Sequence, residues 1–122
     1  LPKTSMGWDI YPDALYEFLM RTKSEHTGDL PLFVTEHGVS NDDVIADGSI
    51  DDHIRIAYLN AHFDAARRAI ADSIPLHGYF VWSLMDNYEW ALGYENGSAS
   101  SMLISTPCSA HPKPLMTILS LP

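Results

Sequence analysis

The sequence predicts an α/β domain built around parallel strands. Predicted helices and strands alternate in the order helix, strand, helix, strand, and the connections between them are short. Both predicted strands contain compact apolar runs, which are typical of parallel strands buried on both faces. This pattern predicts right-handed βα units, which build either an open doubly wound sheet or part of a (β/α)8 barrel. A complete barrel typically needs about 250 residues, so a chain of 122 residues can form a part of one.

The first predicted helix covers residues 12–23, and a strand follows it. Pro12 suits the first turn of a helix because its missing N–H is not needed there. Apolar residues then fall on one helix face: Leu15, Phe18 and Leu19. Gly28 breaks the chain, and the apolar run at residues 32–34 predicts a buried strand that ends at residues 35–36.

The second predicted helix covers residues 52–71. It follows a stretch at residues 37–52 that is rich in Gly, Asn, Ser and Asp, which predicts an exposed loop. Asp52 suits the positive, N-terminal end of the helix dipole. A connector at residues 73–78 then leads to the second predicted strand, at residues 79–84.

Two regions of different character divide the chain. Residues 1–95 contain all the predicted helices and strands. Residues 96–122 are dominated by Ser, Pro, Thr and Ala, and neither a helical nor a strand period can be followed there. We expect this second region to be an irregular, poorly ordered tail without a core.

The composition argues against several partners. Seven Lys and Arg against 16 Asp and Glu give a net charge of -9, whereas a nucleic-acid surface needs clustered Lys and Arg. No apolar run reaches the length of a membrane-spanning helix, so we expect no membrane partner. Cys108 is the only cysteine, and the chain starts without a secretion signal, so we expect a cytoplasmic location.

Three segments of the chain carry distinctive motifs. They are MGWDIYP at residues 6–12, TEHG at residues 35–38 and GYFVWSLMDNYEW at residues 78–90. Together they resemble the closing segments of the family 1 glycoside hydrolases, the retaining β-glucosidases and their relatives. The resemblance implies a C-terminal fragment of a (β/α)8 TIM barrel, in which residues 32–36 resemble strand seven and residues 79–84 resemble strand eight.

The resemblance implies that Glu36, in the TEHG motif, is the catalytic nucleophile. Active sites of such barrels lie at the carboxyl ends of the strands, and a retaining glycosidase needs an ionised carboxylate that forms a glycosyl-enzyme ester. Taken alone, Glu36 could equally be a surface residue at a strand end. The family usually has Asn where this chain has His37. We expect a solvated loop histidine there; the alternative is a charged ring that favours ionised Glu36.

Trp82, Glu89 and Trp90 resemble the residues with which the family holds the non-reducing sugar. An indole can offer a flat apolar face to a pyranose, a carboxylate can accept hydrogen bonds from two hydroxyls, and an indole N–H can donate one. Trp8 resembles a family residue on the leaving-group side, and packing in the core is the alternative for it.

Retaining hydrolysis also needs a second carboxyl group, about 5–5.5 Å from the nucleophile. In the family this general acid lies in an Asn-Glu-Pro motif, and no Asn-Glu pair occurs in this sequence. The resemblance therefore implies a fragment of a β-glucosidase that hydrolyses β-linked glucosides or oligosaccharides by double displacement. We expect the isolated chain to be inactive and prone to aggregation. No metal or cofactor is expected, and no feature predicts an oligomeric state.

The tail departs from the family after Tyr94. Suppose that the reading frame is shifted from Asn96 onward, so that each new codon consists of the last base of one codon and the first two bases of the next. The genetic code then permits the run RFGIVHVDFDTLQRTPK. This run resembles the family's continuation. We therefore expect that one base was lost before this point and that the tail is frameshifted.

Two alternative functions fit parts of the sequence. A non-catalytic carbohydrate-binding module could use the same Trp and Glu side chains without any chemistry at Glu36. A calcium site could use the acidic loop, but its spacing does not match the alternate-position ligands of an EF-hand, so a solvated loop is expected. Its acidic residues are Asp42, Asp43, Asp47, Asp51 and Asp52.

Overall fold

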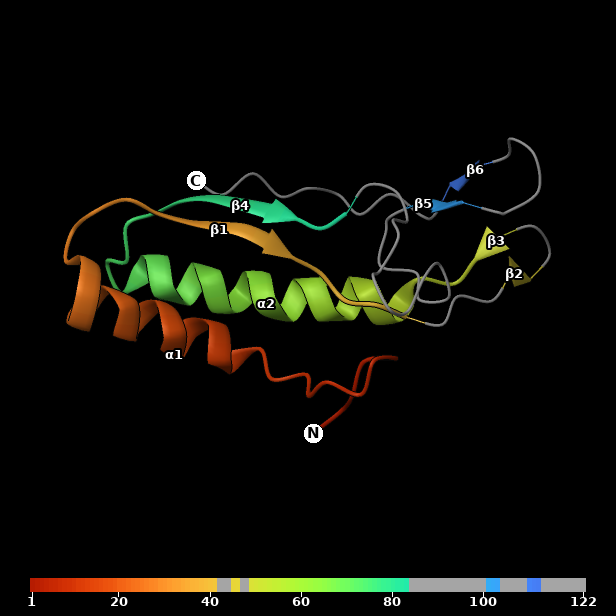
Figure 1. The fold of residues 1–122 in the computed structure, drawn as a ribbon, viewed down its shortest axis with the longest axis horizontal. Coiled ribbons are helices and arrows are strands. Elements are labelled where there is room, and N and C mark those ends of the chain that lie inside the picture. The colour runs from red at the N-terminus through yellow and green to blue at the C-terminus, as the bar shows by residue number, and fades with distance from the viewer. Residues whose placement is uncertain (42–44, 47–48, 84–100, 104–109, 113–122) are drawn as a thin grey trace.

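The described part of the chain has a layer of two parallel strands and a layer of two helices (Figure 1). The computed structural model describes residues 1–41, 45–46, 49–83, 101–103 and 110–112. The strand layer consists of β1 (Leu32–His37) and β4 (Leu76–Val81), and the helix layer of α1 (Asp13–Thr22) and α2 (His53–Ala71). Because β1 and β4 pair in parallel and α2 connects them, the predicted strand–helix–strand arrangement is confirmed.

The first helix extends beyond its predicted end at residue 23. After α1 the chain continues as one π-helical turn, η1 (Lys23–Thr27), and the helix ends at Gly28 with φ of 58°. Within this extension the Thr27 hydroxyl donates to the carbonyl oxygen of Thr22. The helix therefore stops where a glycine can adopt a left-handed backbone, rather than at Lys23.

The second helix begins at His53 and ends at Ala71, within one residue of its prediction. The second strand begins earlier than predicted, because β4 starts at Leu76. The backbone N–H of Leu32 donates to the carbonyl of Pro75 at 2.8 Å, so pairing with β1 already starts there. The predicted connector at residues 73–78 is wrong in its second half.

The core lies between the strand pair and the helices. Ala66 and Ala69 on α2 are fully buried, and their small side chains let the helix lie close to the strands. The buried cluster and the half-buried apolar residues packed against it come from both helices, both strands and the connection into β4. The members are Leu15, Tyr16, Leu19, Met20, Leu32, Val34, Ala66, Ala69, Ile70, Ile74, Leu76 and Tyr79.

The stretch at residues 37–52 is not uniformly exposed. Val39 and Ser40 are buried, and the Ser5 and Ser40 hydroxyl oxygens are hydrogen-bonded at 2.8 Å. The N-terminal segment thus binds the chain directly after β1, and the expectation of an exposed loop is wrong at this end. Farther along, β2 (Ile45–Ala46) and β3 (Ser49–Ile50) pair as an antiparallel hairpin.

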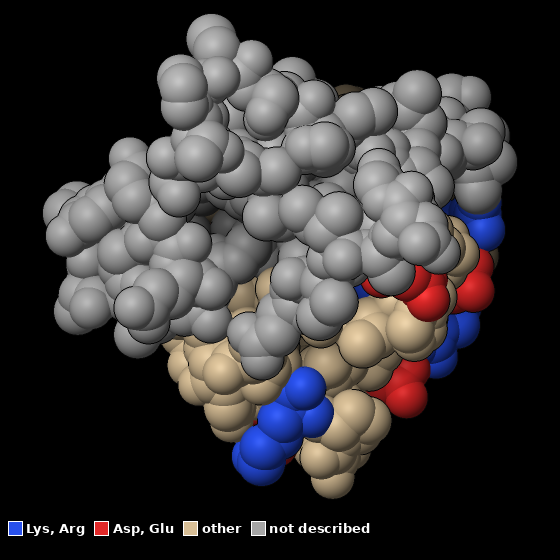
Figure 2. All heavy atoms as spheres, turned by 90° about the vertical axis from the view of Figure 1, so that its right-hand side faces the viewer, with Lys and Arg blue, Asp and Glu red and all other residues tan. Residues whose placement is uncertain are grey.

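In the predicted tail the structure describes two short antiparallel strands, β5 (Ser101–Leu103) and β6 (Ala110–Pro112). The other residues of the tail lie outside the described residues, so its irregular character stays a prediction. No helix in the described ranges is long and apolar enough to cross a membrane. On the described part of the face in Figure 2, Lys and Arg side chains lie among Asp and Glu and form no continuous basic surface.

Candidate active site

An irregularity in strand pairing determines the direction of Glu36. Val34 of β1 is paired with Tyr79 of β4, and His37 is paired with Val81, so two residues of β1 lie opposite the single residue Phe80. Such a β-bulge interrupts the alternation of side chains and often redirects a residue beside an active site. Leu32, Val34 and His37 consequently lie toward the helices, whereas Thr35 and Glu36 are both exposed.

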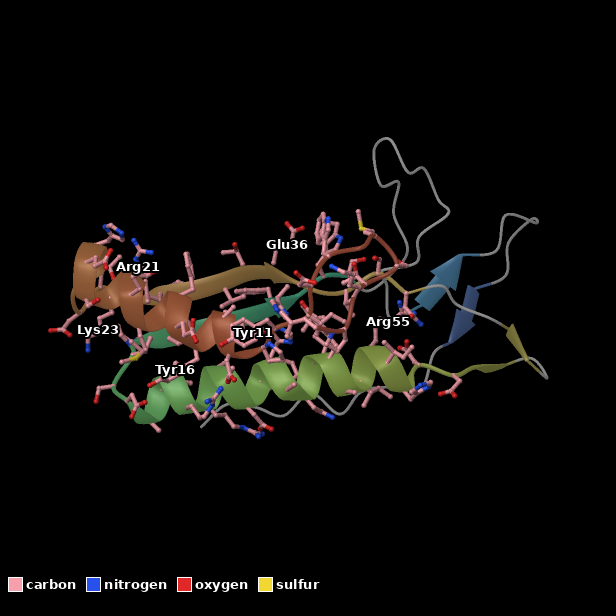
Figure 3. The ribbon with its side chains drawn as sticks, turned by 90° about the horizontal axis from the view of Figure 1, so that it is seen from below. Tyr11, Tyr16, Arg21, Lys23, Glu36 and Arg55 are labelled. Atoms are coloured by element: carbon pink, nitrogen blue, oxygen red, sulfur yellow. The ribbon has the colours of Figure 1, made fainter. Side chains whose placement is uncertain are left out.

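Glu36 therefore stands on the side of β1 that faces away from α2, as Figure 3 shows. The carboxylate is at the carboxyl end of its strand, one residue before the last residue of β1. This is the position expected for a nucleophile in a (β/α)8 barrel.

Trp82 is held next to the end of β1 by backbone contacts. Its N–H donates to the carbonyl of His37 at 2.9 Å. Its own carbonyl oxygen would lie 1.9 Å from a Cβ atom added to Gly38, so a glycine is needed for this close approach. Trp82 is 42% exposed. The structure thus brings residues 36 and 82 to neighbouring strand ends, with both side chains exposed.

His37 is half-buried in a ring cluster rather than solvated in a loop, so that expectation is wrong. Its imidazole stacks on Tyr58 with ring centroids 5.2 Å apart and lies 4.5 Å from His62 and 5.4 Å from Tyr79. His37 Nε2 is hydrogen-bonded to the Tyr58 hydroxyl at 3.3 Å. We call His37, Tyr58, His62 and Tyr79 the ring cluster; it joins the end of β1 to α2 and β4.

Burial favours the neutral forms of the ring cluster. Desolvation, with a contribution from His62, lowers the pKa of His37 to about 4. Desolvation also lowers the pKa of His62 and raises the pKa of Tyr79. His62 Nδ1 donates to the Tyr58 carbonyl at 2.7 Å. At neutral pH His37 is therefore uncharged, and it cannot favour ionised Glu36 through a positive charge.

The sequence alone does not show which side chains surround His37. Tyr58 and His62 are four residues apart in the second predicted helix, a spacing that places them on one face. This four-residue spacing is the feature of the sequence that points to a shared face for the two rings. The direction of the His37 ring depends on the bulge in β1, which the sequence alone does not show.

The remaining predicted site residues are only partly described. Trp8 is 66% exposed, so core packing is wrong for it, and the Ser5–Ser40 hydrogen bond holds its segment near the end of β1. Glu89 and Trp90 lie outside the described residues. Of the acidic loop, Asp51 and Asp52 are described, and Asp52 pairs with Arg55 at 2.7 Å.

No group of three or more His, Cys, Asp or Glu side chains that could hold a metal ion occurs in the part of the chain that the structure describes. The chemistry open to the described site is that of an exposed carboxylate and an exposed indole at the ends of two neighbouring parallel strands.

The chain is similar to known glycosyl hydrolases. The family model Glycosyl hydrolase family 1 matches residues 1–97. The chain is 50% identical over 95 residues to the 1,4-beta-D-glucan glucohydrolase of Thermotoga neapolitana, covering 77% of this chain and 22% of that protein. It is also 50% identical over 95 residues to Beta-glucosidase A of Thermotoga maritima, covering 77% of this chain and 21% of that protein.

A solved structure of the family 1 β-glucosidase from Thermotoga maritima in complex with isofagomine lactam is similar with a TM-score of 0.88 and 41% identity. The similarity covers 93% of this chain and 26% of that one. The structure is thus that of a fragment of a TIM-barrel glycosidase. The chain belongs to glycosyl hydrolase family 1, and it spans about a fifth of the length of the curated relatives that it matches.

Proposed function

We propose that this chain supplies the nucleophile and part of the sugar site of a retaining β-glucosidase. In the first step the Glu36 carboxylate attacks the anomeric carbon of a β-linked glucoside, and the bond from that carbon to the leaving oxygen breaks. The leaving oxygen takes a proton from a general acid. Water then attacks the same carbon and gives a proton to the group that acted as general acid, while the bond from this carbon to Glu36 breaks, which releases the sugar and restores the carboxylate.

The observation that carries this proposal is the bulge between Val34 and His37. It turns Glu36 away from the helices at the carboxyl end of β1, where a substrate can reach it. A carboxylate that only capped a strand would need no such redirection. The relatives named as glucosidases support the class of substrate.

The sugar would be held beside this carboxylate. We propose that the exposed indole of Trp82 packs against the ring of the glucose unit. Glu89 and Trp90 would bind its hydroxyls, and Trp8 would lie toward the leaving group. We thus propose that these four residues, Trp8, Trp82, Glu89 and Trp90, bind the substrate and that Glu36 reacts with it.

The general acid must come from outside this sequence, which has no Asn-Glu pair. Since protonation of the leaving group and attack by the nucleophile occur in one transition state, we expect the isolated chain to be inactive. We further propose that residues 1–95 form the C-terminal, strand-seven and strand-eight part of the barrel.

A hybrid enzyme tests the proposal. Residues 1–97 of this chain replace the matching segment of Thermotoga maritima Beta-glucosidase A, so that the rest of the barrel supplies the general acid. We expect this hybrid to hydrolyse an aryl β-glucoside and to release β-glucose first. Glu36→Gln should lower kcat by about 10⁴-fold or more, because the ester cannot form.

Two controls accompany this variant. Glu25→Gln changes an exposed carboxylate on η1 and should leave kcat within about twofold. A 2-fluoro-glucoside should form a stable ester on the peptide that contains Glu36 in the unsubstituted hybrid. A hybrid that binds β-glucosides but turns them over equally well with Gln at position 36 would instead favour the carbohydrate-binding module.

A further inference from the structure

The end of β1 that carries Glu36 is fixed to the rest of the fold through the residue beside it. Glu36 is exposed, and among the described residues none forms a hydrogen bond or ion pair with its carboxylate. Its place therefore depends on the backbone that carries it. His37 holds that backbone, because its ring lies in the ring cluster and its carbonyl oxygen accepts the N–H of Trp82 at 2.9 Å. One residue thus connects α2 with both strand ends of the proposed site.

On α2 the ring cluster has a well-packed base. Tyr58 and His62 lie one turn apart with ring centroids 4.0 Å from each other, and His62 Nδ1 is hydrogen-bonded to the Tyr58 carbonyl at 2.7 Å. His62 is buried. From β4 the Tyr79 ring packs edge-on against Phe63 of the same helix at 5.0 Å. Packing of this kind holds side chains in single rotamers, so the helix offers His37 a fixed surface.

Tyr58 makes the polar contact with the imidazole of His37. Its hydroxyl is hydrogen-bonded to Nε2 at 3.3 Å, and the two rings stack with an interplanar angle of 20°. The other ring nitrogen of His37, Nδ1, is buried and has no hydrogen-bond partner among the described residues. Within the part of the chain that the structure describes, the Tyr58 hydroxyl is therefore the group that fixes the rotation of the imidazole.

A nucleophile needs exact placement as well as the correct direction. A displacement of about 1 Å can lower a rate on the order of 100-fold, and accurate sites are held by neighbours that packing and hydrogen bonds lock in place. We propose that Tyr58 is a positioning residue for Glu36, acting through the His37 ring that it stacks on and hydrogen-bonds. The bulge decides the side on which Glu36 stands, and Tyr58 restrains the strand end that carries it. This inference rests on the proposed function for the role of Glu36.

The hybrid enzyme that contains residues 1–97 of this chain tests the proposal. Tyr58→Phe keeps the stacked ring and removes the hydroxyl. We expect kcat for an aryl β-glucoside to fall about fivefold and KM to stay within about twofold, because the attack depends on placement of the carboxylate more than sugar binding does. The rate at which a 2-fluoro-glucoside labels Glu36 should fall by the same factor. An unchanged kcat and labelling rate would overturn the proposal.

Tyr16→Phe is the matched control. The Tyr16 hydroxyl also joins two elements, since it donates to Asp72 Oδ2 at 2.6 Å, but this bond lies at the residue that ends α2. Tyr16→Phe should leave kcat and the labelling rate within about twofold, and urea unfolding checks that both variants are folded. An equal loss of kcat in both variants would show a general effect of lost stability and would contradict positioning by Tyr58.

A double-mutant cycle shows whether Tyr58 acts through His37. His37→Phe keeps an aromatic ring and removes Nε2, so the contact with the Tyr58 hydroxyl is already lost. Adding Tyr58→Phe to this variant should therefore leave kcat within about twofold. A further loss of about fivefold in the double variant would mean that the two residues act independently, and the proposal would then be wrong.

Failure of this proposal is distinguishable from failure of the proposed function. A hybrid that stays active with Glu36→Gln would remove the catalytic assignment and the positioning role with it. A hybrid that loses activity with Glu36→Gln but keeps its kcat with Tyr58→Phe would keep the nucleophile and remove only the positioning role of Tyr58.

Discussion

The half-buried imidazole of His37 should make the stability of the folded chain depend on pH. In an unfolded chain the ring takes up a proton near pH 6.5, whereas in the folded chain its pKa is lowered to about 4 by burial and by His62. The stabilising contribution of the neutral ring is therefore fully present above about pH 6.5. It is lost as the pH falls toward 4, because the unfolded state binds the proton first.

The size of this effect follows from the two pKa values. The difference between 6.5 and about 4 corresponds to about 3 kcal/mol. Solvent reaches part of the ring, so we expect about 2 kcal/mol. The groups that face the ring are Tyr58 and His62 on α2 and Tyr79 on β4, and Glu36 projects away from it.

The measurement compares the hybrid enzyme with its His37→Asn variant, which lacks the titrating ring. Urea unfolding of both proteins is followed at several pH values between 7.5 and 4.5. The free energy of unfolding of the unsubstituted hybrid should fall by about 2 kcal/mol more than that of the variant. His62 is present in both proteins, so its own protonation contributes to both curves.

His26→Asn is the matched control, because His26 is an exposed histidine on η1. Its pH profile should run parallel to that of the unsubstituted hybrid. If the His37→Asn profile also runs parallel over this range, the ring is not held neutral by its surroundings, and the reasoning from burial fails.

Two further predictions concern the backbone at the site and the tail. Gly38→Ala should destabilise the hybrid by about 3 kcal/mol in the same urea experiment, since the new Cβ atom would lie 1.9 Å from the Trp82 carbonyl oxygen. Gly7→Ala, with φ of 80° and open space around it, should cost about 1 kcal/mol; an equal cost at both positions would refute the steric explanation. For the tail, the DNA that encodes residues 96–113 should spell RFGIVHVDFDTLQRTPK in the shifted frame, and codons that cannot do so would exclude a lost base.

The sequence predicted the order and type of the main elements well because their signals are local. The apolar run at residues 32–34 and the helical spacing in residues 52–71 report burial directly, and α2 begins one residue from its predicted start. The start of β4 was missed because Leu76 follows a proline and is recruited by pairing with Leu32. Pairing partners lie far apart in the sequence, so no local pattern contains them.

The positions of the site residues were predicted from the sequence, but the direction of one side chain was not. The motifs identified Glu36 and Trp82 as residues that lie at strand ends, and the structure places them at neighbouring ends. The direction of His37 was not predictable, because it depends on the number of residues between two pairs in the β1–β4 ladder. Strict alternation would have turned Glu36 toward α2 and His37 toward solvent.

The bulge also decides which of two adjacent side chains faces the helices. Glu36 is exposed on the side where the proposed substrate would lie, whereas His37 packs between the strand and α2. A substitution at position 37 can therefore change how firmly the strand is anchored to α2 while the carboxylate that we propose as the nucleophile keeps its direction.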